Sequence, residues 1–404
     1  MPTLSVFRYR LPLVRPLPLR GHTVTVREGL LVRLKDGGYT GWGDVAPLPG
    51  FSAETIDEAT HALQALAGMT ADDLVSAQHD EALPPSVRYG LALAAWDLDA
   101  HRRAVPLPTV LAEEASPTVP LNGLLAGDAD TILHDATRLA QAGYRTLKLK
   151  VGRGDLAEEA ALVRDLHAAH PAVALRLDAN RAWAYDEARR FAEALGDAQI
   201  EYIEEPLTDP AKLADFAAET GLPVALDESA TAMEPDDLDA HAYARAIVLK
   251  PTFLGGTRAW ALATRAQALG LRVTWSAAFE SGVGLRGLVV MAAATGTPTA
   301  TPTPAGLDTY RWLAADVFAP DAAALPLGTP LVAVADALAP RALDVGRLTP
   351  VALQRYSVAL RDRRRSSPPG QGEPEGVAGR SSMIDHPQPL LSRRGAIKVY
   401  AFCY

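Results

Sequence analysis

Hydrophobic and polar residues alternate strictly in one short segment near the middle of the chain. Leu147, Leu149 and Val151 would face one side of a β-strand, and Lys148 and Lys150 the other, because side chains alternate across a strand. Burying two ammonium groups is costly unless anions or a polar cavity receive them. Taken alone, the segment is equally compatible with an edge strand whose lysines lie in solvent.

The same pattern recurs in later segments, each of which is short, apolar on one side and ends in a charged residue. Helical segments separate these strands, and this alternation is typical of βα units around a parallel sheet. Counting from residues 118–121 gives about eight strands, which predicts a (β/α)8-type barrel. The other predicted strands are 175–178, 202–206, 224–229, 247–251, 271–276 and 305–309, and the helices are 155–170, 186–195, 210–219 and 235–242.

The first 100 or so residues follow a different pattern and predict an α+β domain that caps the barrel. Two strands and a hairpin turn at 36–38 indicate an antiparallel sheet, with a polar, proline-containing loop at 15–27 that would act as a lid over the site. Helices are expected at 53–66 and 85–103. The predicted domains are a cap (1–103), a barrel (104–317), a C-terminal segment that returns to the cap (318–360) and a disordered tail rich in Gly, Pro, Ser and charge (361–404).

Three acidic residues, Asp178, Glu204 and Asp227, end successive predicted barrel strands. In such barrels the carboxyl ends of the strands form the active site, so these carboxylates would converge and need a cation to stay ionised together. Oxygen ligands without His or Cys favour Mg²⁺. Lys150 and Lys250 would flank the metal from opposite sides, an arrangement suited to removing a proton next to a carboxylate.

The ordered motifs resemble those of the enolase superfamily, in its muconate-lactonizing-like branch, and are most similar to the o-succinylbenzoate synthase family. The resemblance extends over about residues 1–315. It rests on Lys148-x-Lys150, Leu177-Asp178-Ala179-Asn180, Ile203-Glu204-Glu205-Pro206, Leu226-Asp227-Glu228-Ser229, Leu249-Lys250-Pro251 and Gly306-Leu307-Asp308-Thr309.

This resemblance implies syn dehydration of 2-succinyl-6-hydroxy-2,4-cyclohexadiene-1-carboxylate in menaquinone biosynthesis, through an enediolate. Lys150 would be the base, Lys250 would face the enediolate, and Lys148 would lower the pKa of Lys150. Arg20 would meet the succinyl carboxylate, and Ser276 would lie near the substrate carboxylate.

Four further residues are predicted to support the site. Gly306 would let the substrate approach the last strand closely. Asn180, Glu205 and Glu228 adjoin ligand positions and are interpreted as hydrogen-bond partners behind the ligands, with a surface salt bridge as the alternative for the two glutamates. The amides near Gly282 are a weaker candidate for binding an anionic tail.

Two other functions remain open. A racemase of N-acylamino acids or a dipeptide epimerase of the same superfamily needs the same lysines and metal. Dipeptide epimerases carry an Asp-x-Asp at the last strand, and Asp308 has no second Asp at 306 or 310, which disfavours that alternative. A non-catalytic barrel that binds a carboxylate or a partner is the third possibility, and chelation of the metal would distinguish it from an enzyme.

Composition narrows the classes of partner. The net charge is −9 and no basic stripe appears in the body of the chain, so nucleic acid is not an expected partner. No run of about 18 apolar residues and no signal peptide are evident, so we expect no membrane contact. The single cysteine, Cys403, fits a reducing cytoplasm. The expected partner is a small-molecule carboxylate substrate, and the oligomeric state stays open.

Overall fold

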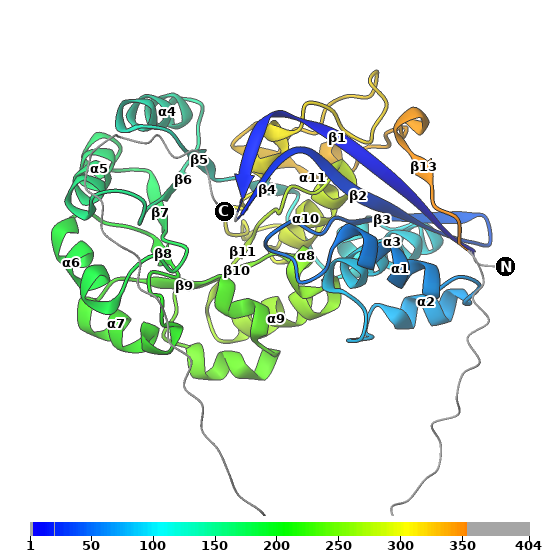
Figure 1. Ribbon diagram of the computed structural model, residues 1–404, viewed down its shortest axis with the longest axis horizontal. Helices are drawn as coiled ribbons and strands as arrows, with labels where there is room; N and C mark the ends of the chain where they lie inside the picture. The colour runs from blue at the N-terminus through cyan, green and yellow to red at the C-terminus, as the bar shows by residue number, and fades with distance from the viewer. Residues whose placement is uncertain (1–2, 20, 354–404) are drawn as a thin grey trace, which may run out of the picture. The chain divides into compact units, whose positions relative to one another are not determined.

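The computed structural model describes residues 3–19 and 21–353, which form an antiparallel sheet with its helices and a curved parallel sheet with its helices (Figure 1). The tail predicted to be disordered (361–404) and Arg20 lie outside the described residues. Within the described part, no helix combines the length and apolar character needed to cross a bilayer.

Seven parallel strands follow one another around the barrel in the order β11-β10-β9-β8-β7-β6-β5, so each pairs with its neighbour in the sequence. This order requires a helical crossover after each strand, as the alternation of patterns predicts. The strands are β5 (Gly123–Leu125), β6 (Thr146–Lys150), β7 (Ala174–Asp178), β8 (Tyr202–Glu204), β9 (Val224–Leu226), β10 (Ala246–Leu249) and β11 (Arg272–Trp275).

The eighth position of the barrel is held by single bridges and contains no regular strand. Ala305 bridges to Leu121 and Gly306 bridges to Ser276, both in parallel. The chain then turns at once into a 3-10 helix, Asp308–Trp312, which ends the predicted strand 305–309 early. The (β/α)8-type fold with an α+β cap is confirmed in this form.

The expected first barrel strand at 118–121 is wrong for its regular part, and only its end, Leu121, bridges to the eighth barrel position. β4 (Thr118–Pro120) pairs antiparallel with β12 (Leu331–Ala333), in a separate two-stranded sheet. Its partner lies more than 200 residues further along the sequence, and an apolar run of this length does not reveal which strand it will join. β5, a few residues later, starts the parallel sheet.

Helices lie on the outer side of the parallel strands (Figure 1). α10 differs from the others because it is buried on nearly all sides and packs between the barrel and the cap. A helix that is apolar all round is expected in such a position. The barrel helices are α4 (Ala129–Gln141), α5 (Leu156–Ala169), α6 (Tyr185–Leu195), α7 (Leu213–Thr220), α8 (Pro251–Leu254), α9 (Gly256–Ala268) and α10 (Gly282–Ala294), and the predicted helix at 235–242 is a 3-10 helix, Pro235–His241.

The cap is a four-stranded antiparallel sheet in the order β13-β1-β2-β3 with three helices. Gly43 in β3 lets α3 pack closely, since a Cβ there would collide with the carbonyl oxygen of Gly90. Thr55 caps α1, because its side chain accepts from the N–H of Glu58. The cap elements are β1 (Thr3–Leu19), β2 (His22–Asp36), β3 (Tyr39–Val45), β13 (Thr349–Pro350), α1 (Ile56–Ala65), α2 (Ala71–Ala77) and α3 (Pro85–Arg103); α2 was not predicted.

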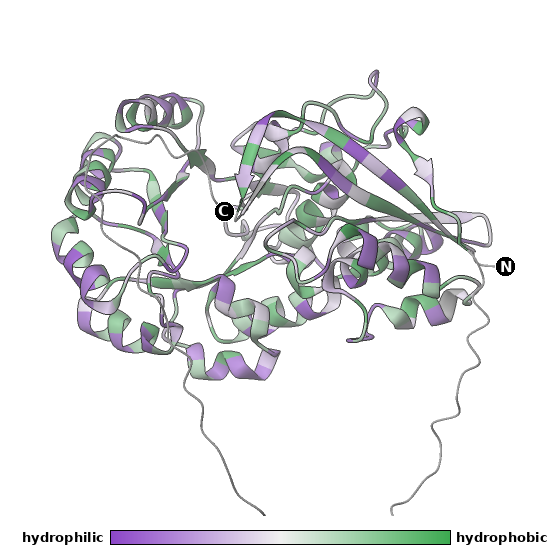
Figure 2. Ribbon diagram, viewed as in Figure 1, coloured by the Kyte–Doolittle hydropathy of each residue, from purple (hydrophilic) through white to green (hydrophobic). Residues whose placement is uncertain are grey.

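The predicted loop conformation at 15–27 is wrong, because β1 and β2 form one long hairpin through this region; its action as a lid stays a prediction. Their pairing continues to Leu19 and His22, with an irregularity between Pro12 and Leu17. Hydrophobic residues and polar ones alternate along both strands (Figure 2), and Leu17 and Leu19 pack in an apolar cluster with Leu48 and Phe279. The prolines suggested a loop, but burial of this apolar face stabilises the strand conformation through them. After β12 the chain forms α11 (Val334–Leu338) and then β13, which pairs with β1. The exact domain boundaries stay a prediction.

Candidate active site

Three carboxylates converge at the carboxyl ends of consecutive barrel strands. Asp178 ends β7, Glu204 ends β8 and Asp227 follows β9. The parallel register places Asp178 directly opposite Glu204. One oxygen of each carboxylate lies within 4.8 Å of the others, and all three residues are buried. The strand register alone therefore gathers the acidic residues that the sequence places far apart.

Two lysines contact this trio from different strands. The Nζ of Lys148 on β6 donates to Glu204 Oε2 at 2.6 Å and lies 3.0 Å from Asp178 Oδ2. Lys250, which follows β10, donates to Asp227 Oδ1 at 2.9 Å and Oδ2 at 2.6 Å. Burial alone would lower the pKa of Lys148, but Asp178 and Glu204 outweigh it and hold that pKa well above its ordinary value. Both lysines therefore carry positive charge at neutral pH.

The third lysine, Lys150, has a different environment. Its Nζ donates to Asn180 Oδ1 at 2.8 Å and lies 3.5 Å from Asp178 Oδ2. Burial lowers the pKa of Lys150 to about 8, opposed by Asp178 and reinforced by Lys148, among other cations. The expected influence of Lys148 is thus present, but burial is the larger cause. Lys150 is the lysine of the three whose neutral form is accessible near neutral pH.

The trio of carboxylates fits a hard divalent cation. Burial raises the pKa of Glu204 to about 7, and the charges of Asp178 and Asp227 add to this rise against the attraction of Lys148. Buried carboxylates that repel one another in this way are stabilised by a cation bound between them. Carboxylate oxygens, with no nitrogen or sulfur in the group, are the ligands that Mg²⁺ and similar ions prefer.

Glu205 holds the backbone beside one of these carboxylates. Its side chain is fully buried, and its Oε1 accepts from the backbone N–H of Asp227 at 3.1 Å and of Ser229 at 2.8 Å. Its Oε2 accepts from Arg181 Nε at 3.0 Å. Glu205 itself adopts a left-handed backbone conformation (φ 38°), which is strained for a residue other than glycine. A surface salt bridge, the alternative interpretation, does not describe this buried cluster.

Three of the remaining predicted residues, Glu228, Ser276 and Gly306, each lie close to another predicted residue. Glu228 accepts from Asn180 Nδ2 at 3.3 Å, next to Lys150. Ser276 and Gly306 face each other across a bridge, and a Cβ on Gly306 would lie 3.2 Å from Ser276 Oγ. The structure does not test a contact of Arg20 with substrate, since Arg20 is outside the described residues.

The amides at the start of α10 do not form the anion site that the two glycines suggested. The N–H of Gly282 donates to Asp316 Oδ1 at 2.8 Å, and the N–H of Ser281 donates to Asp44 Oδ2 at 2.8 Å. Two carboxylates of the chain itself therefore satisfy this helix end. The sequence pattern located the helix correctly but could not reveal these distant partners.

A cavity of about 270 Å³ adjoins the charged centre. Asn180, Asp227 and Lys250 line one side of it, and apolar residues from the cap and the barrel line the other. The sequence missed Arg181 and Phe253 in this lining, although the segment 47–52 was considered as a wall. The full apolar part of the lining is Leu48, Phe51, Phe253, Ala277 and Ala278.

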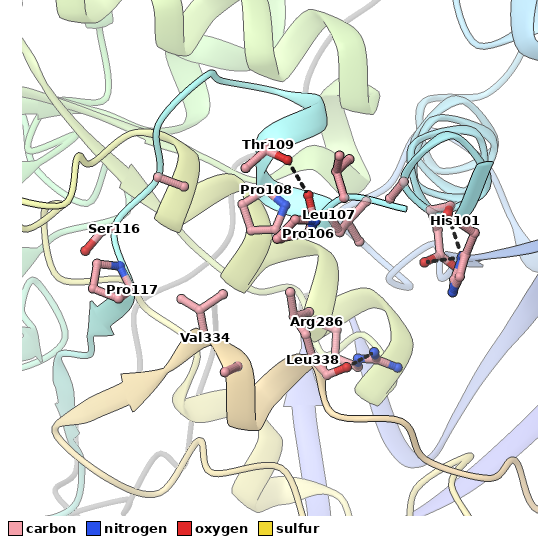
Figure 3. A pocket seen from close by; sticks show the side chains of 15 residues that line it. His101, Pro106, Leu107, Pro108, Thr109, Ser116, Pro117, Arg286, Val334 and Leu338 are labelled. Atoms are coloured by element: carbon pink, nitrogen blue, oxygen red, sulfur yellow. Dashed lines mark hydrogen bonds and ion pairs between the residues drawn. The ribbon is translucent and has the colours of Figure 1, made fainter. Parts of the chain in front are cut away.

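A second cavity of about 470 Å³ lies beside the end of α3 (Figure 3). None of the predicted catalytic or metal-binding residues lines it. The guanidinium of Arg286 there donates to the carbonyl oxygen of Leu338 at 2.8 Å. Of the charged groups that suit catalysis, Asp227 and Lys250 line the smaller cavity.

Two family models match the chain. The model described as "Enolase C-terminal domain-like" matches residues 131–324, and the model described as "MenC, N-terminal domain" matches residues 1–98. The chain is 35% identical over 330 residues to the o-succinylbenzoate synthase of Yersinia pseudotuberculosis serotype I (strain IP32953), covering 79% of this chain and 94% of that protein. The o-succinylbenzoate synthase of Yersinia pestis (strain Pestoides F) matches with the same identity and coverage.

Solved structures show the same fold. A mandelate racemase/muconate lactonizing protein from Herpetosiphon aurantiacus matches with a TM-score of 0.71 at 24% identity, covering 82% of this chain and 95% of that chain. The L-Ala-D/L-Glu epimerase from Bacillus subtilis matches with a TM-score of 0.70 at 24% identity, covering 86% and 99%. At this identity the likeness concerns the fold and does not distinguish between reactions.

Proposed function

The chain belongs to the o-succinylbenzoate synthase family of the enolase superfamily, and from this membership we propose how its charged side chains carry the reaction. The activity is a dehydration that converts 2-succinyl-6-hydroxy-2,4-cyclohexadiene-1-carboxylate to 2-succinylbenzoate in menaquinone biosynthesis. The observation that supports our assignment of roles is that Lys150 lies beside Asp178 and Lys250 beside Asp227, two different members of the buried carboxylate trio.

Lys150 is the base in this proposal. Its neutral amine removes the proton α to the substrate carboxylate, and Asn180 Oδ1, 2.8 Å from Nζ, orients the amine. The resulting ammonium then returns the proton to the departing hydroxyl on the same face, so elimination is syn. A single residue serves as base and acid because its pKa, about 8, lies close to neutral pH.

Lys250 and the three carboxylates complete the proposed machinery. The ammonium of Lys250 faces the negative charge that develops on the substrate and stabilises it, without moving a proton itself. Asp178, Glu204 and Asp227 would hold Mg²⁺, which when bound supplies positive charge to the substrate carboxylate. Lys148, held between Asp178 and Glu204, fixes the orientation of both carboxylates.

Absorbance spectroscopy tests this proposal by following loss of the cyclohexadiene and formation of the aromatic product with Mg²⁺ present. We expect wild-type protein to turn over, and Lys150→Met to lower kcat by about 10²–10⁴-fold, the usual contribution of a general base. Lys212→Met, a change at an exposed lysine, is the control. Failure of the wild-type protein to aromatise the substrate, or normal turnover by Lys150→Met, would contradict the proposal.

Isotope exchange separates this reaction from the racemase or epimerase alternative. A racemase needs Lys150 and Lys250 as bases on opposite faces, whereas the dehydratase moves protons through Lys150 only. Asp308, which an epimerase would use to bind a substrate ammonium, lies 3.0 Å from Arg311. In deuterated water, exchange of an N-acylamino acid at both faces would favour the alternative.

A further inference from the structure

A buried arginine of the cap lies between the two loops that form the apolar walls of the active-site cavity. Arg27 on β2 is only 2% exposed, and within the described residues it forms no ion pair with a carboxylate. Burying a charge without such a partner is costly unless other polar groups satisfy it. The groups that satisfy Arg27 therefore indicate what this residue does.

Within the described residues, every group to which the guanidinium of Arg27 donates is a backbone carbonyl oxygen, including that of its neighbour Glu28 at 3.0 Å. Nε donates to Phe279 at 2.9 Å, Nη1 donates to Pro47 at 2.7 Å, and Nη2 donates to Ala46 and, at 3.4 Å, to Ala278. Ala46 and Pro47 belong to the cap, and Ala278 and Phe279 belong to the barrel loop between β11 and α10. The planar, rigid guanidinium thus joins one loop of the cap to one loop of the barrel.

These two loops carry the facing apolar walls of the cavity. Leu48 and Phe51 follow the carbonyl groups of the cap loop, and Ala277 and Ala278 belong to the barrel loop. Phe279 has a left-handed backbone conformation (φ 61°), which costs free energy for a residue with a side chain. The hydrogen bond from Arg27 to its carbonyl oxygen helps to keep this loop in place.

A second buried group of the cap holds the same barrel loop. Asp44 accepts from the N–H and the hydroxyl of Ser281, both at 2.8 Å, and from the hydroxyl of Tyr9 at 2.9 Å. Glu280 extends the connection into the barrel, because it accepts from Thr252, two residues after Lys250, at 2.5 Å. Contacts therefore run without a gap from the cap to the segment that carries a proposed catalytic lysine.

We propose that Arg27 is a positioning residue that sets the separation of the two apolar walls, and with it the fit of the part of the substrate that does not react. This inference rests on the proposed function, in which the charged centre holds the substrate carboxylate; we infer in addition that the adjoining cavity receives the succinyl arm. Among the described residues Arg27 neither lines this cavity nor bonds to the three carboxylates, so it acts through the loops. Its loss should weaken substrate binding and leave the acid–base groups in place.

The test compares Arg27→Lys with Arg33→Lys, a change on the same strand at a half-buried arginine outside the cavity lining. Lysine keeps the positive charge but cannot reach several carbonyl groups at once. We expect kcat/KM to fall by roughly 10- to 100-fold, because a displacement of about 1 Å has an effect of this size. The loss should lie mostly in KM, while Arg33→Lys changes KM less than about twofold.

Two further measurements keep the inference falsifiable. Hydrogen exchange of segments 46–52 and 277–281 needs no turnover, so it tests the connection even if the synthase assay itself fails; we expect faster exchange in both segments for Arg27→Lys only. If Arg27→Lys does not fold, Ser281→Ala, which removes one bond to Asp44, should raise KM several-fold with kcat unchanged. Equal KM in Arg27→Lys and Arg33→Lys, a loss confined to kcat, unchanged exchange, or a normal KM for Ser281→Ala would each overturn it.

Discussion

Replacing Glu205 by Gln should weaken metal binding although Glu205 is not one of the three carboxylates. The change keeps the size of the side chain and removes its charge. The carbonyl oxygen of Gln can still accept from the N–H groups of Asp227 and Ser229, now as a neutral acceptor. Its NH₂ group, however, would face Arg181 Nε–H, so two donors would meet where a 3.0 Å hydrogen bond exists in the wild type.

The size of the effect follows from these bonds. A hydrogen bond to a charged group contributes about 1.5–3 kcal/mol and a neutral one about 0.5–1.5 kcal/mol. Losing one charged bond and weakening two others by about 1–1.5 kcal/mol each should therefore lower the free energy of unfolding by about 3.5–6 kcal/mol. The backbone of Asp227 would also lose its fixed orientation, and disturbed support behind a ligand typically lowers metal affinity by about 10- to 100-fold.

Titration with Mn²⁺, followed by electron paramagnetic resonance, measures the affinity, and urea unfolding measures the stability. Glu193→Gln is the matched control, because Glu193 is exposed and its ion pair within the described residues is with Arg189 on the same helix. We expect the control to change either quantity by less than about 0.5 kcal/mol. An affinity of Glu205→Gln within twofold of the wild type would refute the reasoning, whatever its stability.

Further predictions concern pH, packing and the metal. Burial raises the pKa of Asp308 to about 6 in the folded state; the folded protein binds this proton more tightly than the unfolded chain, so stability should fall as pH rises from about 4 to 6, by at most about 3 kcal/mol. Urea unfolding of Asp308→Asn should lack this part of the pH dependence, and an identical slope would contradict it. Gly284→Ala should destabilise the fold by about 1–3 kcal/mol, since its Cβ would lie 2.6 Å from Glu280 Cβ; Gly154→Ala, with 3.7 Å to its nearest atom, should not, and equal melting temperatures would exclude the clash. EDTA should abolish turnover and Mg²⁺ restore it, whereas turnover in EDTA would exclude a role for the metal.

The charged centre could be predicted because its lysines and carboxylates stand at the carboxyl ends of apolar strands. A carboxylate or amine directly after an apolar strand reaches the mouth of a barrel whatever the intervening helices contain. Lys150, Asp178 and Asp227 could therefore be located from alternation alone. The pattern also predicted the helices between these residues, but not the exact ends of the helices or which segments form 3-10 helices.

The features that the sequence did not reveal depend on distant partners. β4 looks like any short apolar strand, and only its pairing with β12 excludes it from the barrel. Prolines at 16 and 18 suggested a loop, and the hairpin was missed because the apolar cluster that supports it is assembled from remote segments. Arg27 could not be identified, since its partners are backbone carbonyl groups, which every residue has.

The cap sheet draws its strands from both ends of the described chain, because β13 pairs with β1. During synthesis on the ribosome, β1, β2 and β3 emerge first and must wait for nearly all of the barrel before their last neighbour appears. The outer edge of β1 at Phe7 and Arg8 therefore gains this neighbour only after the barrel sequence has been made. In a nascent chain stalled before β13, this edge should be more open to protease than in the full chain.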